Sequence, residues 1–314
     1  RESKSLKEMS QNIMFMGTPE FSIPTLKTLI RSEHKIISVY SQPAKKSNRG
    51  MKINSSSVEI FAKDNSLNLR CPISLNNEEE YNFFKKLNPD LVIVVAYGKI
   101  IPEKYLKIPK NGFINLHASL LPKWRGAAPI QRSIMNQDDQ TGISIMKIVE
   151  KLDSGPVMHQ DKININEGVD TLTLSKILSE IGAKSILSSI DSIERRKAIF
   201  IEQDHSQATY AKKISKAESQ INWEDNAKTI LAKINGLNPN PGAWFKYKNE
   251  RYKIWKAEII KKKDQVGLVV DNNLTISCND HSIRILEIQK EGKSRQSSNK
   301  FLLGNKIKQG EKFI

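Results

Sequence analysis

Cysteine is scarce in this chain of 314 residues, which has only Cys71 and Cys278. Two cysteines form neither a disulfide framework nor a four-ligand zinc site, so a reducing, cytoplasmic setting is expected. No window approaches the roughly 18 apolar residues of a membrane span. The polar opening RESKSLKEMS also lacks an apolar signal core, and we interpret it as a leader before the first strand. The sequence therefore predicts a cytoplasmic protein with no membrane partner.

Several nucleotide and metal motifs are also absent. The first predicted turn, MGTPEF, has one glycine and is not G-x-G-x-x-G, so it offers no usual cradle for a dinucleotide pyrophosphate. The chain has no G-x-x-x-x-G-K-[ST], no H-E-x-x-H and no C-x-x-C. Nicotinamide, ATP and zinc are therefore poor candidates, and we expect no metal.

Positive charge is what the chain has in excess. The formal net charge is +16, and residues 212–314 alone hold 21 Lys and Arg against 11 Asp and Glu. A proteome rich in Lys, Asn and Ile would raise basic counts everywhere. Alternatively, the C-terminal third presents a surface to a polyanion, whose phosphates attract Lys and Arg. Composition leaves both explanations open.

Strands and helices alternate through the first two-thirds of the chain. Apolar strands are expected near residues 12–17, 34–41, 89–98, 112–119, 141–149 and 155–165. Helical patterns fall near residues 19–31, 55–66, 78–87, 128–137 and 171–190, with Thr18 as a candidate N-cap of the first helix. This alternation predicts an α/β fold with an open, Rossmann-like, mostly parallel sheet.

The pattern changes near residues 199–212. One helix is expected over residues 223–236, followed by short strands at 243–249, 250–260, 265–272, 273–279 and 282–290. Short strands at near-regular spacing are typical of a small antiparallel β-barrel of the OB-like kind. We therefore predict a catalytic domain over residues 11–198, a linker over 199–211 and a basic barrel over 212–314.

Three polar residues interrupt the apolar pattern where strands end. Asn115 and His117 are two apart, so they share one face of their strand. Asp153 lies in an Asp-Ser-Gly turn after the next strand, and we expect it at the same edge of the sheet. A carboxamide stabilises an oxyanion, an imidazole moves protons near neutral pH, and a carboxylate raises the imidazole pKa. These groups suit acyl transfer to an amine without a metal or a covalent intermediate.

The segment around His117 also carries a resemblance. INLHASLLPKWRGAAPIQ (residues 114–131) resembles the formyltransferase signature Asn-x-His-x-Ser-Leu-Leu-Pro-x-x-x-Gly, and its Arg-Gly-Ala-Ala-Pro-Ile-Gln end is similar to the methionyl-tRNA formyltransferase family. MFMGTPEFSIPTL, VVAYGKIIP, KLDSGPV and ATYAKKISKAESQINW extend the likeness over about residues 12–245. A single motif would identify only the wider superfamily that uses 10-formyltetrahydrofolate.

The resemblance implies roles for particular residues. The catalytic trio falls on Asn115, His117 and Asp153, and the folate-contacting segment comprises Ser119, Leu120, Leu121 and Pro122. It implies 10-formyltetrahydrofolate as formyl donor, tetrahydrofolate as product and methionyl initiator tRNA as acceptor for translation initiation. One complete site in one chain also favours a monomer.

A basic loop at residues 41–57 is similar to a family loop that enters the tRNA acceptor stem. Arg49 matches the key arginine, and Lys45, Lys46 and Lys52 are further candidate tRNA contacts. The loop departs from the family pattern at Ala44, Asn48 and Met51, and the entry to the C-terminal domain departs at Gln220 and Asn222. In the barrel, the candidate phosphate contacts are Lys212, Lys213, Lys246 and the run Lys261, Lys262 and Lys263.

Two other functions remain open at this point. A formyltransferase with a small-molecule amine as acceptor would need the same trio but neither the basic loop nor the basic barrel. A nucleic-acid-binding protein on an inactive α/β scaffold would need the basic surfaces alone. Trp124 and Arg125 follow the folate segment; contact with the acceptor and packing in the core are both open for Trp124.

Overall fold

The computed structural model describes residues 10–47 and 52–313, which fall into two compact units. Unit 1 comprises the described residues up to 127 together with residues 142–163 and 175–210. Unit 2 comprises residues 128–141, 164–174 and 211–313. The segments 128–141 and 164–174 thus belong to the C-terminal unit, although they precede the predicted linker in sequence.

Unit 1 is built on the alternating part of the chain. Its strands are β1 (Asn12–Gly17), β2 (Lys35–Tyr40), β3 (Lys45–Ser47), β4 (Lys52–Asn54), β5 (Leu69–Arg70), β6 (Leu91–Val95), β7 (Phe113–His117), β8 (Arg125–Gly126), β9 (Gln140–Lys147), β10 (Val157–Asn164) and β11 (Tyr210–Ala211). Its helices are the 3-10 helix η1 (Glu20–Ser22), α2 (Ile23–Ile30), α3 (Ser57–Asp64), α4 (Glu78–Leu87), α5 (Glu103–Leu106), α7 (Thr171–Glu194) and the 3-10 helix η2 (His205–Gln207). The first residues of β9 and of α7 and the last residue of β10 and of β11 are assigned to unit 2.

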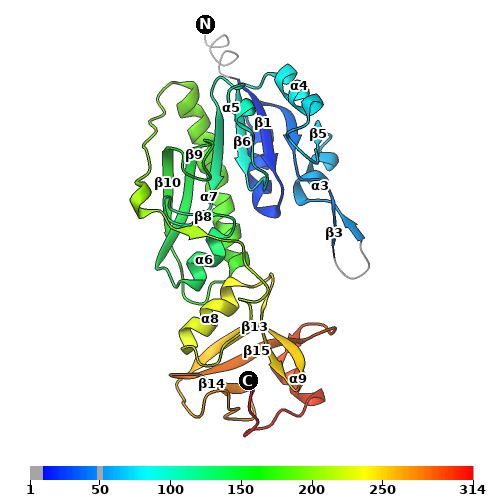
Figure 1. Ribbon diagram of the computed structural model, residues 1–314, viewed down its shortest axis with the longest axis vertical. Helices are drawn as coiled ribbons and strands as arrows, with labels where there is room; N and C mark the ends of the chain where they lie inside the picture. Colours follow the sequence, from blue (N-terminus) through cyan, green and yellow to red (C-terminus); the bar gives the residue numbers. More distant parts are fainter. Residues whose placement is uncertain (1–9, 48–51, 314) are drawn as a thin grey trace. The chain divides into compact units, whose positions relative to one another are not determined.

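Seven strands form the main sheet in the order β10-β9-β7-β6-β1-β2-β5. β5, β2, β1, β6 and β7 run parallel, whereas β9 pairs antiparallel with β7. β6 is buried along its whole length, as expected of a parallel strand covered on both faces. The predicted Rossmann-like, mostly parallel sheet is confirmed. Figure 1 shows this sheet and the β3–β4 hairpin, which extends away from it.

Alternation along β7 explains why two of its side chains remain available for a site. Leu116 packs against α7, where Gly182 approaches so closely that a Cβ would lie 2.5 Å from the leucine side chain. Asn115 and His117 therefore lie on the opposite face of β7. A glycine at 182 lets the long helix cover one face of the strand, while the other face carries polar groups.

Unit 2 contains a second sheet and three helices. The strands are β12 (Ala243–Tyr247), β13 (Glu250–Ile260), β14 (Thr275–Ser277), β15 (Ser282–Lys290) and β16 (Gln296–Ser297), and the helices are α6 (Pro129–Met135), α8 (Ala227–Gly236) and α9 (Ser298–Gly304). The strands form an antiparallel half-barrel in the order β12-β13-β15-β14, with β16 paired to β15. Trp223, Phe245, Tyr252 and Phe313 lie in its core. The small C-terminal β fold is confirmed.

Two local predictions are wrong. Thr18 does not cap a helix, because its hydroxyl donates to the Tyr97 backbone oxygen, 2.8 Å away, and α2 begins only at Ile23. Residues 265–272 form isolated bridges at Leu268 and Val269 rather than a strand. Gly267 has a φ of +80°, outside the extended region, and a Cβ added there would lie 2.3 Å from the Phe313 backbone oxygen.

No helix in the described part of the chain is long and apolar enough to cross a lipid bilayer.

Candidate active site

His117 closes β7 and is 6% exposed. Its Nε2 lies 2.9 Å from the backbone oxygen of Trp124. Because a carbonyl oxygen only accepts hydrogen bonds, Nε2 carries the proton. The other ring nitrogen, Nδ1, lies 3.7 Å from Oδ2 of Asp153. The neutral ring therefore turns its lone pair towards the carboxylate, and a second proton on Nδ1 would bring a positive charge there.

Asp153 reaches His117 by a different route from the one predicted. β9 is antiparallel to β7, so Lys147 at its end lies beside Ile114, away from the end of β7 at which His117 stands. The loop after β9 folds back and places the carboxylate beside His117, where Oδ2 also accepts from the Gly126 N–H at 2.8 Å. The predicted proximity holds in the structure, whereas the expectation of a shared sheet edge is wrong.

Asn115 stands on the same face of β7 as His117 and is half-buried. Its backbone is held between Val94 of β6 and Met146 of β9. Its carboxamide makes no hydrogen bond to any residue of the described chain, so both amide hydrogens are free to donate to a substrate. The structure thus brings together the three residues predicted to be catalytic.

The segment Ser119–Pro122 forms a tightly bonded corner after β7. Ser144 of β9 organises it: the Ser144 hydroxyl donates to the Ser119 backbone oxygen at 2.6 Å and accepts from the Leu121 N–H at 3.0 Å. Gln160 of β10 donates to the Leu121 oxygen at 3.0 Å. Ser119 and Leu121 are buried, whereas Leu120 and Pro122 are half-buried. The Ser119 hydroxyl donates to the Lys123 oxygen, so it serves the corner itself.

Trp124 and Arg125 have different environments. Trp124 is half-buried with a φ of +61°, and its backbone oxygen is the hydrogen-bond acceptor for His117. Arg125 is 1% exposed and donates to Gln203 and His205. The Arg125 side chain is therefore packed in the interior and is not placed to contact an acceptor substrate. Trp124 supports the site through its backbone oxygen, whereas Arg125 is held in the interior by its side chain.

The predicted basic loop forms the β3–β4 hairpin, in which Lys45 pairs with Asn54, Lys46 with Ile53 and Ser47 with Lys52. The Lys45 ammonium donates to Gln42 at 2.5 Å. Arg49, the predicted key contact, lies outside the described residues. The hairpin leaves the sheet after β2, on the side where the parallel strands end.

Several residues that support this site carried no signal in the sequence. Gly126, Ser144, Gln160 and Gln203 make their contacts with partners 16 to 78 residues away. Gly126 belongs to the formyltransferase signature, but Ser144, Gln160 and Gln203 lie outside the segments that suggested catalysis. Contacts of such long range are invisible to local patterns.

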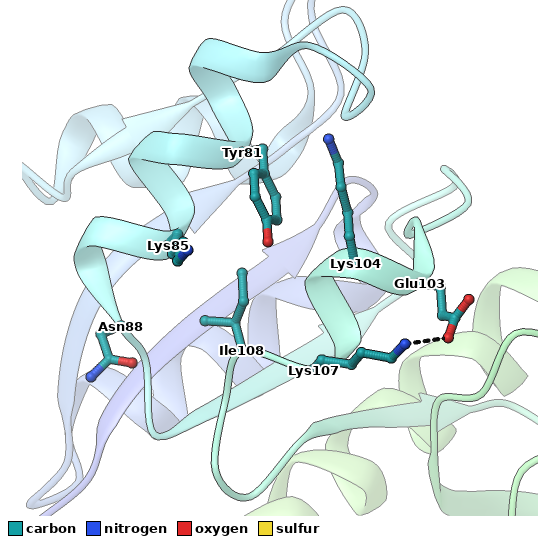
Figure 2. Close-up of a pocket in the computed structure, with 7 residues that line it drawn as sticks. All are labelled: Tyr81, Lys85, Asn88, Glu103, Lys104, Lys107 and Ile108. Carbon is teal, nitrogen blue, oxygen red and sulfur yellow. Dashed lines mark ion pairs between the residues drawn. The ribbon is translucent and has the colours of Figure 1, made fainter.

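Two other features lie away from the trio. A hollow between α4 and α5 is lined by Tyr81, Lys85, Asn88, Glu103, Lys104, Lys107 and Ile108 (Figure 2). His34, Asp191 and Glu194 form the cluster within the described ranges whose side chains approach closely enough to share a metal ion. The Nδ1 of His34 accepts from the Gln11 N–H, so Nε2 of the neutral ring carries a proton and has no lone pair for a metal.

Comparison with known proteins decides the family. A model described as "Formyl transferase" matches residues 11–190, more than half of the chain, and one described as "Formyl transferase, C-terminal domain" matches residues 213–306. The chain belongs to the formyl transferase family. The two models match separate parts of the chain.

Full-length relatives of this formyl transferase are named methionyl-tRNA formyltransferase. The protein from Pelagibacter ubique (strain HTCC1062) is 53% identical over 97% of this chain and 99% of its own length. The protein from Thermodesulfovibrio yellowstonii (strain ATCC 51303 / DSM 11347 / YP87) is 41% identical over 96% and 98%, respectively. The resemblance to methionyl-tRNA formyltransferases that the motifs indicated is confirmed.

Two solved structures share the fold of this chain. HypX from Aquifex aeolicus, in complex with tetrahydrofolic acid, is 17% identical with a TM-score of 0.67 over 93% of this chain and 47% of that chain. An N-formyltransferase from Helicobacter canadensis, in complex with folinic acid and dTDP-3-aminofucose, is 16% identical with a TM-score of 0.65 over 89% and 99%. At these identities the likeness concerns the fold alone.

Proposed function

We propose that this formyl transferase moves the formyl group of 10-formyltetrahydrofolate to the α-amino group of methionyl initiator tRNA. The convergence of Asn115, His117 and Asp153 on one face of β7 carries the proposal, because acyl transfer to an amine needs an oxyanion donor and a proton relay. The names of the full-length relatives support the acceptor, and the folates in the related structures support the donor.

Each residue of the trio has one task in this reaction. The acceptor amine forms a bond to the formyl carbon while the carbonyl electron pair moves onto oxygen. The free amide hydrogens of Asn115 donate to that oxygen, and the imidazolium of His117 adds positive charge beside it. When the bond to the folate nitrogen breaks, the proton lost by the amine replaces the formyl group on that nitrogen. Asp153, whose Oδ2 lies 3.7 Å from Nδ1 of His117, accepts the proton in transit through water.

No metal and no covalent enzyme intermediate enter this scheme. The corner Ser119–Pro122 would hold the folate, since it borders His117 and its own polar groups are already bonded to Ser144 and Gln160. All three reacting groups come from one chain, and we propose a monomer. The acceptor would place the reaction in the cytoplasm, where tRNA is charged and used.

Recognition of tRNA is proposed for two basic parts of the chain. Lys45, Lys46, Lys52 and Arg49 of the hairpin region would contact the acceptor stem. Residues 212–314 hold 21 Lys and Arg against 11 Asp and Glu, and their lysines would neutralise phosphates along the tRNA. Domain boundaries at about residues 198 and 212 would separate formyl transfer from this electrostatic binding.

A competition between acceptors tests the proposal. The full chain is given 10-formyltetrahydrofolate and, side by side, methionyl initiator tRNA, a dTDP-amino-sugar and glycinamide ribonucleotide. We expect formylmethionyl-tRNA to form with a kcat/KM at least about 10³ times that for either small amine. Comparable turnover of a small amine would show that the acceptor is misassigned, and turnover of none would reject the transferase itself.

A further inference from the structure

The carboxylate of Asp153 is held in a strained turn. Its φ of +48° lies in the left-handed region, which side chains other than glycine adopt only where the surroundings hold them. The turn is closed by the Ser154 N–H, which donates to the Lys151 oxygen at 3.3 Å. Lys151 and Leu152 are exposed and add little support. Something outside the turn must therefore hold it.

That support comes from Gln203, which is 8% exposed and belongs to the segment predicted to be a linker. Its side-chain nitrogen donates to the Asp153 backbone oxygen at 2.9 Å and to the Gly155 backbone oxygen at 2.7 Å. The same carboxamide thus forms hydrogen bonds to the backbone on both sides of Ser154. Both of its hydrogens are used, so the amide is fixed in orientation.

The other end of Gln203 is fixed by Arg125. The carboxamide oxygen accepts from Nε and Nη2 of the buried guanidinium at 3.1 and 2.7 Å. The backbone of Arg125 is bonded to the residue before β11, since its N–H donates to the Thr209 oxygen at 2.8 Å. The next residue, Gly126, donates to Asp153 Oδ2. Both the backbone and the carboxylate of Asp153 are therefore tied to one small network.

We propose that Gln203 is a positioning residue for formyl transfer: it holds the Asp153 turn so that the carboxylate faces Nδ1 of His117. This inference rests on the proposed roles of Asp153 and His117. Gln203 touches no reacting atom; it acts through Asp153. The segment after α7 is then part of the catalytic apparatus and not only a connection between the two units.

The chemistry of the side chain makes the inference specific. Gln203→Glu keeps an acceptor for Arg125 and strengthens that contact with a charge, but it removes both donors to the Asp153 and Gly155 oxygens. Gln203→Ala removes both the acceptor for Arg125 and the donors to the Asp153 and Gly155 oxygens. If the donors position Asp153, both variants must lose activity. If Arg125 alone needs the contact, Gln203→Glu stays active.

Steady-state kinetics with methionyl-tRNA on the full chain test this. We expect both variants to lower kcat about 10- to 100-fold, as displacement of a reacting group by about 1 Å does, with KM for both substrates within about two-fold. Gln207→Ala is the matched control, because Gln207 lies in the same segment, is exposed and directs its side-chain nitrogen to the neighbouring Ser206 hydroxyl. It should keep wild-type kcat.

A double-variant cycle separates positioning from general damage. In an Asp153→Ala background, measured in single turnovers, Gln203→Ala should cost less than about three-fold, since the group it positions is gone. Full multiplication of the two losses, wild-type kcat in Gln203→Ala, or wild-type kcat in Gln203→Glu would each overturn the inference.

Amide hydrogen exchange of Gly126 gives a readout that needs no activity. Its N–H is protected by Asp153, so it should exchange faster in Gln203→Ala and Gln203→Glu but not in Gln207→Ala. Unchanged protection would overturn the inference. Failure of the proposed function looks different: the wild type would then not formylate methionyl-tRNA, or Asp153→Ala would keep full kcat, while the exchange test of Gln203 would still stand.

Discussion

Nδ1 of His117 and Oδ2 of Asp153 are 3.7 Å apart, and both side chains are anchored by backbone groups of the segment from Trp124 to Gly126. The backbone oxygen of Trp124 accepts a hydrogen bond from Nε2 of His117, and the Gly126 N–H donates one to Oδ2 of Asp153. Because Trp124 and Gly126 are separated by one residue, a single short segment sets both partners. The pair is oriented before any substrate arrives, as electrostatic preorganisation requires.

Loss of the imidazole is expected to abolish this relay. His117→Ala should lower kcat about 10²- to 10⁴-fold, the usual contribution of a positioned acid or base. The Kd for tRNA should stay within about two-fold, because a buried ring contributes little to phosphate contacts. Kinetics and filter binding on the same preparation measure the two effects.

His159→Ala is the matched control for that experiment. His159 also faces a carboxylate, with Nε2 2.9 Å from Asp161 Oδ2, but its side chain is 41% exposed and it stands on β10. It should keep wild-type kcat. Near-normal turnover by His117→Ala, or an equal loss in both variants, would contradict the assigned role.

Replacement of Asn115 by aspartate isolates the oxyanion contact. Asn115→Asp has almost the same shape but has no amide donor and places a negative charge where charge develops on the formyl oxygen. We expect kcat to fall about 10²- to 10³-fold with little change in the KM for tRNA. A similar loss in Asn111→Asp, at a residue before β7 that bonds to Gln11, would show that the effect is not local.

Binding of tRNA should depend steeply on salt. The logarithm of affinity is expected to fall with the logarithm of salt concentration, with a slope of about 0.7–0.9 per phosphate neutralised. Replacing Lys46 and Lys52 together by alanine should reduce that slope by about 1.4–1.8 and leave kcat at saturating tRNA unchanged. Lys107→Ala should not change it, because Lys107 follows α5, outside the hairpin, and pairs with Glu103. A flat salt response in the wild type would remove the electrostatic account.

Much of the fold and part of the candidate site could be predicted from the regular spacing of apolar residues in the sequence. The buried run of β6 and the two-residue spacing of Asn115 and His117 follow from strand geometry, so they were predictable. The route to Asp153 was not, because no local pattern shows that β9 is antiparallel to β7. The resemblance implied that Asn115, His117 and Asp153 act together. How Asp153 reaches His117 became visible only in the folded structure.

Competition between local and distant contacts explains the remaining errors. Thr18 has the chemistry of an N-cap, but the Tyr97 oxygen, far along the chain, takes its hydroxyl. Residues 265–272 are apolar enough for a strand, yet Gly267 takes a φ of +80°, which is outside the extended region of a strand. Gln203 lay in a segment interpreted as a linker, since its partners Arg125 and Asp153 are assembled only by folding.

The two thiols should differ sharply in reactivity. Burial raises the pKa of Cys278 to about 12, so almost no thiolate exists at pH 8, and the side chain has no exposed surface. Burial also raises the pKa of Cys71, which is only half-buried. With iodoacetamide at pH 8, mass spectrometry should find slow labelling of Cys71 and none of Cys278 until denaturant is added. Labelling of Cys278 at the denatured rate would contradict its burial.

The acid Glu80 should make stability depend on pH. It is 6% exposed and accepts from both Arg70 Nε and Nη2, at 2.8 and 2.7 Å, and from the Tyr40 hydroxyl at 2.6 Å. Burial alone would raise the pKa of Glu80, but these hydrogen bonds outweigh it and hold the pKa below its usual value. Because the folded state favours the ionised form, the stabilisation is full above the unfolded pKa and is lost as pH falls through the folded one.

Glu80→Gln is therefore expected to lower the free energy of unfolding by about 1–3 kcal/mol at pH 7, where the charge-assisted bonds are intact. The gap to wild type should shrink as pH falls below about 4.5, the range in which the wild-type carboxylate becomes protonated. Urea denaturation at several pH values measures it. Glu79→Gln, also in the first turn of α4 but exposed, corrects for the interaction with the helix dipole. A gap that stayed constant from pH 7 to pH 3 would show that shape, and not charge, makes Glu80 stabilising.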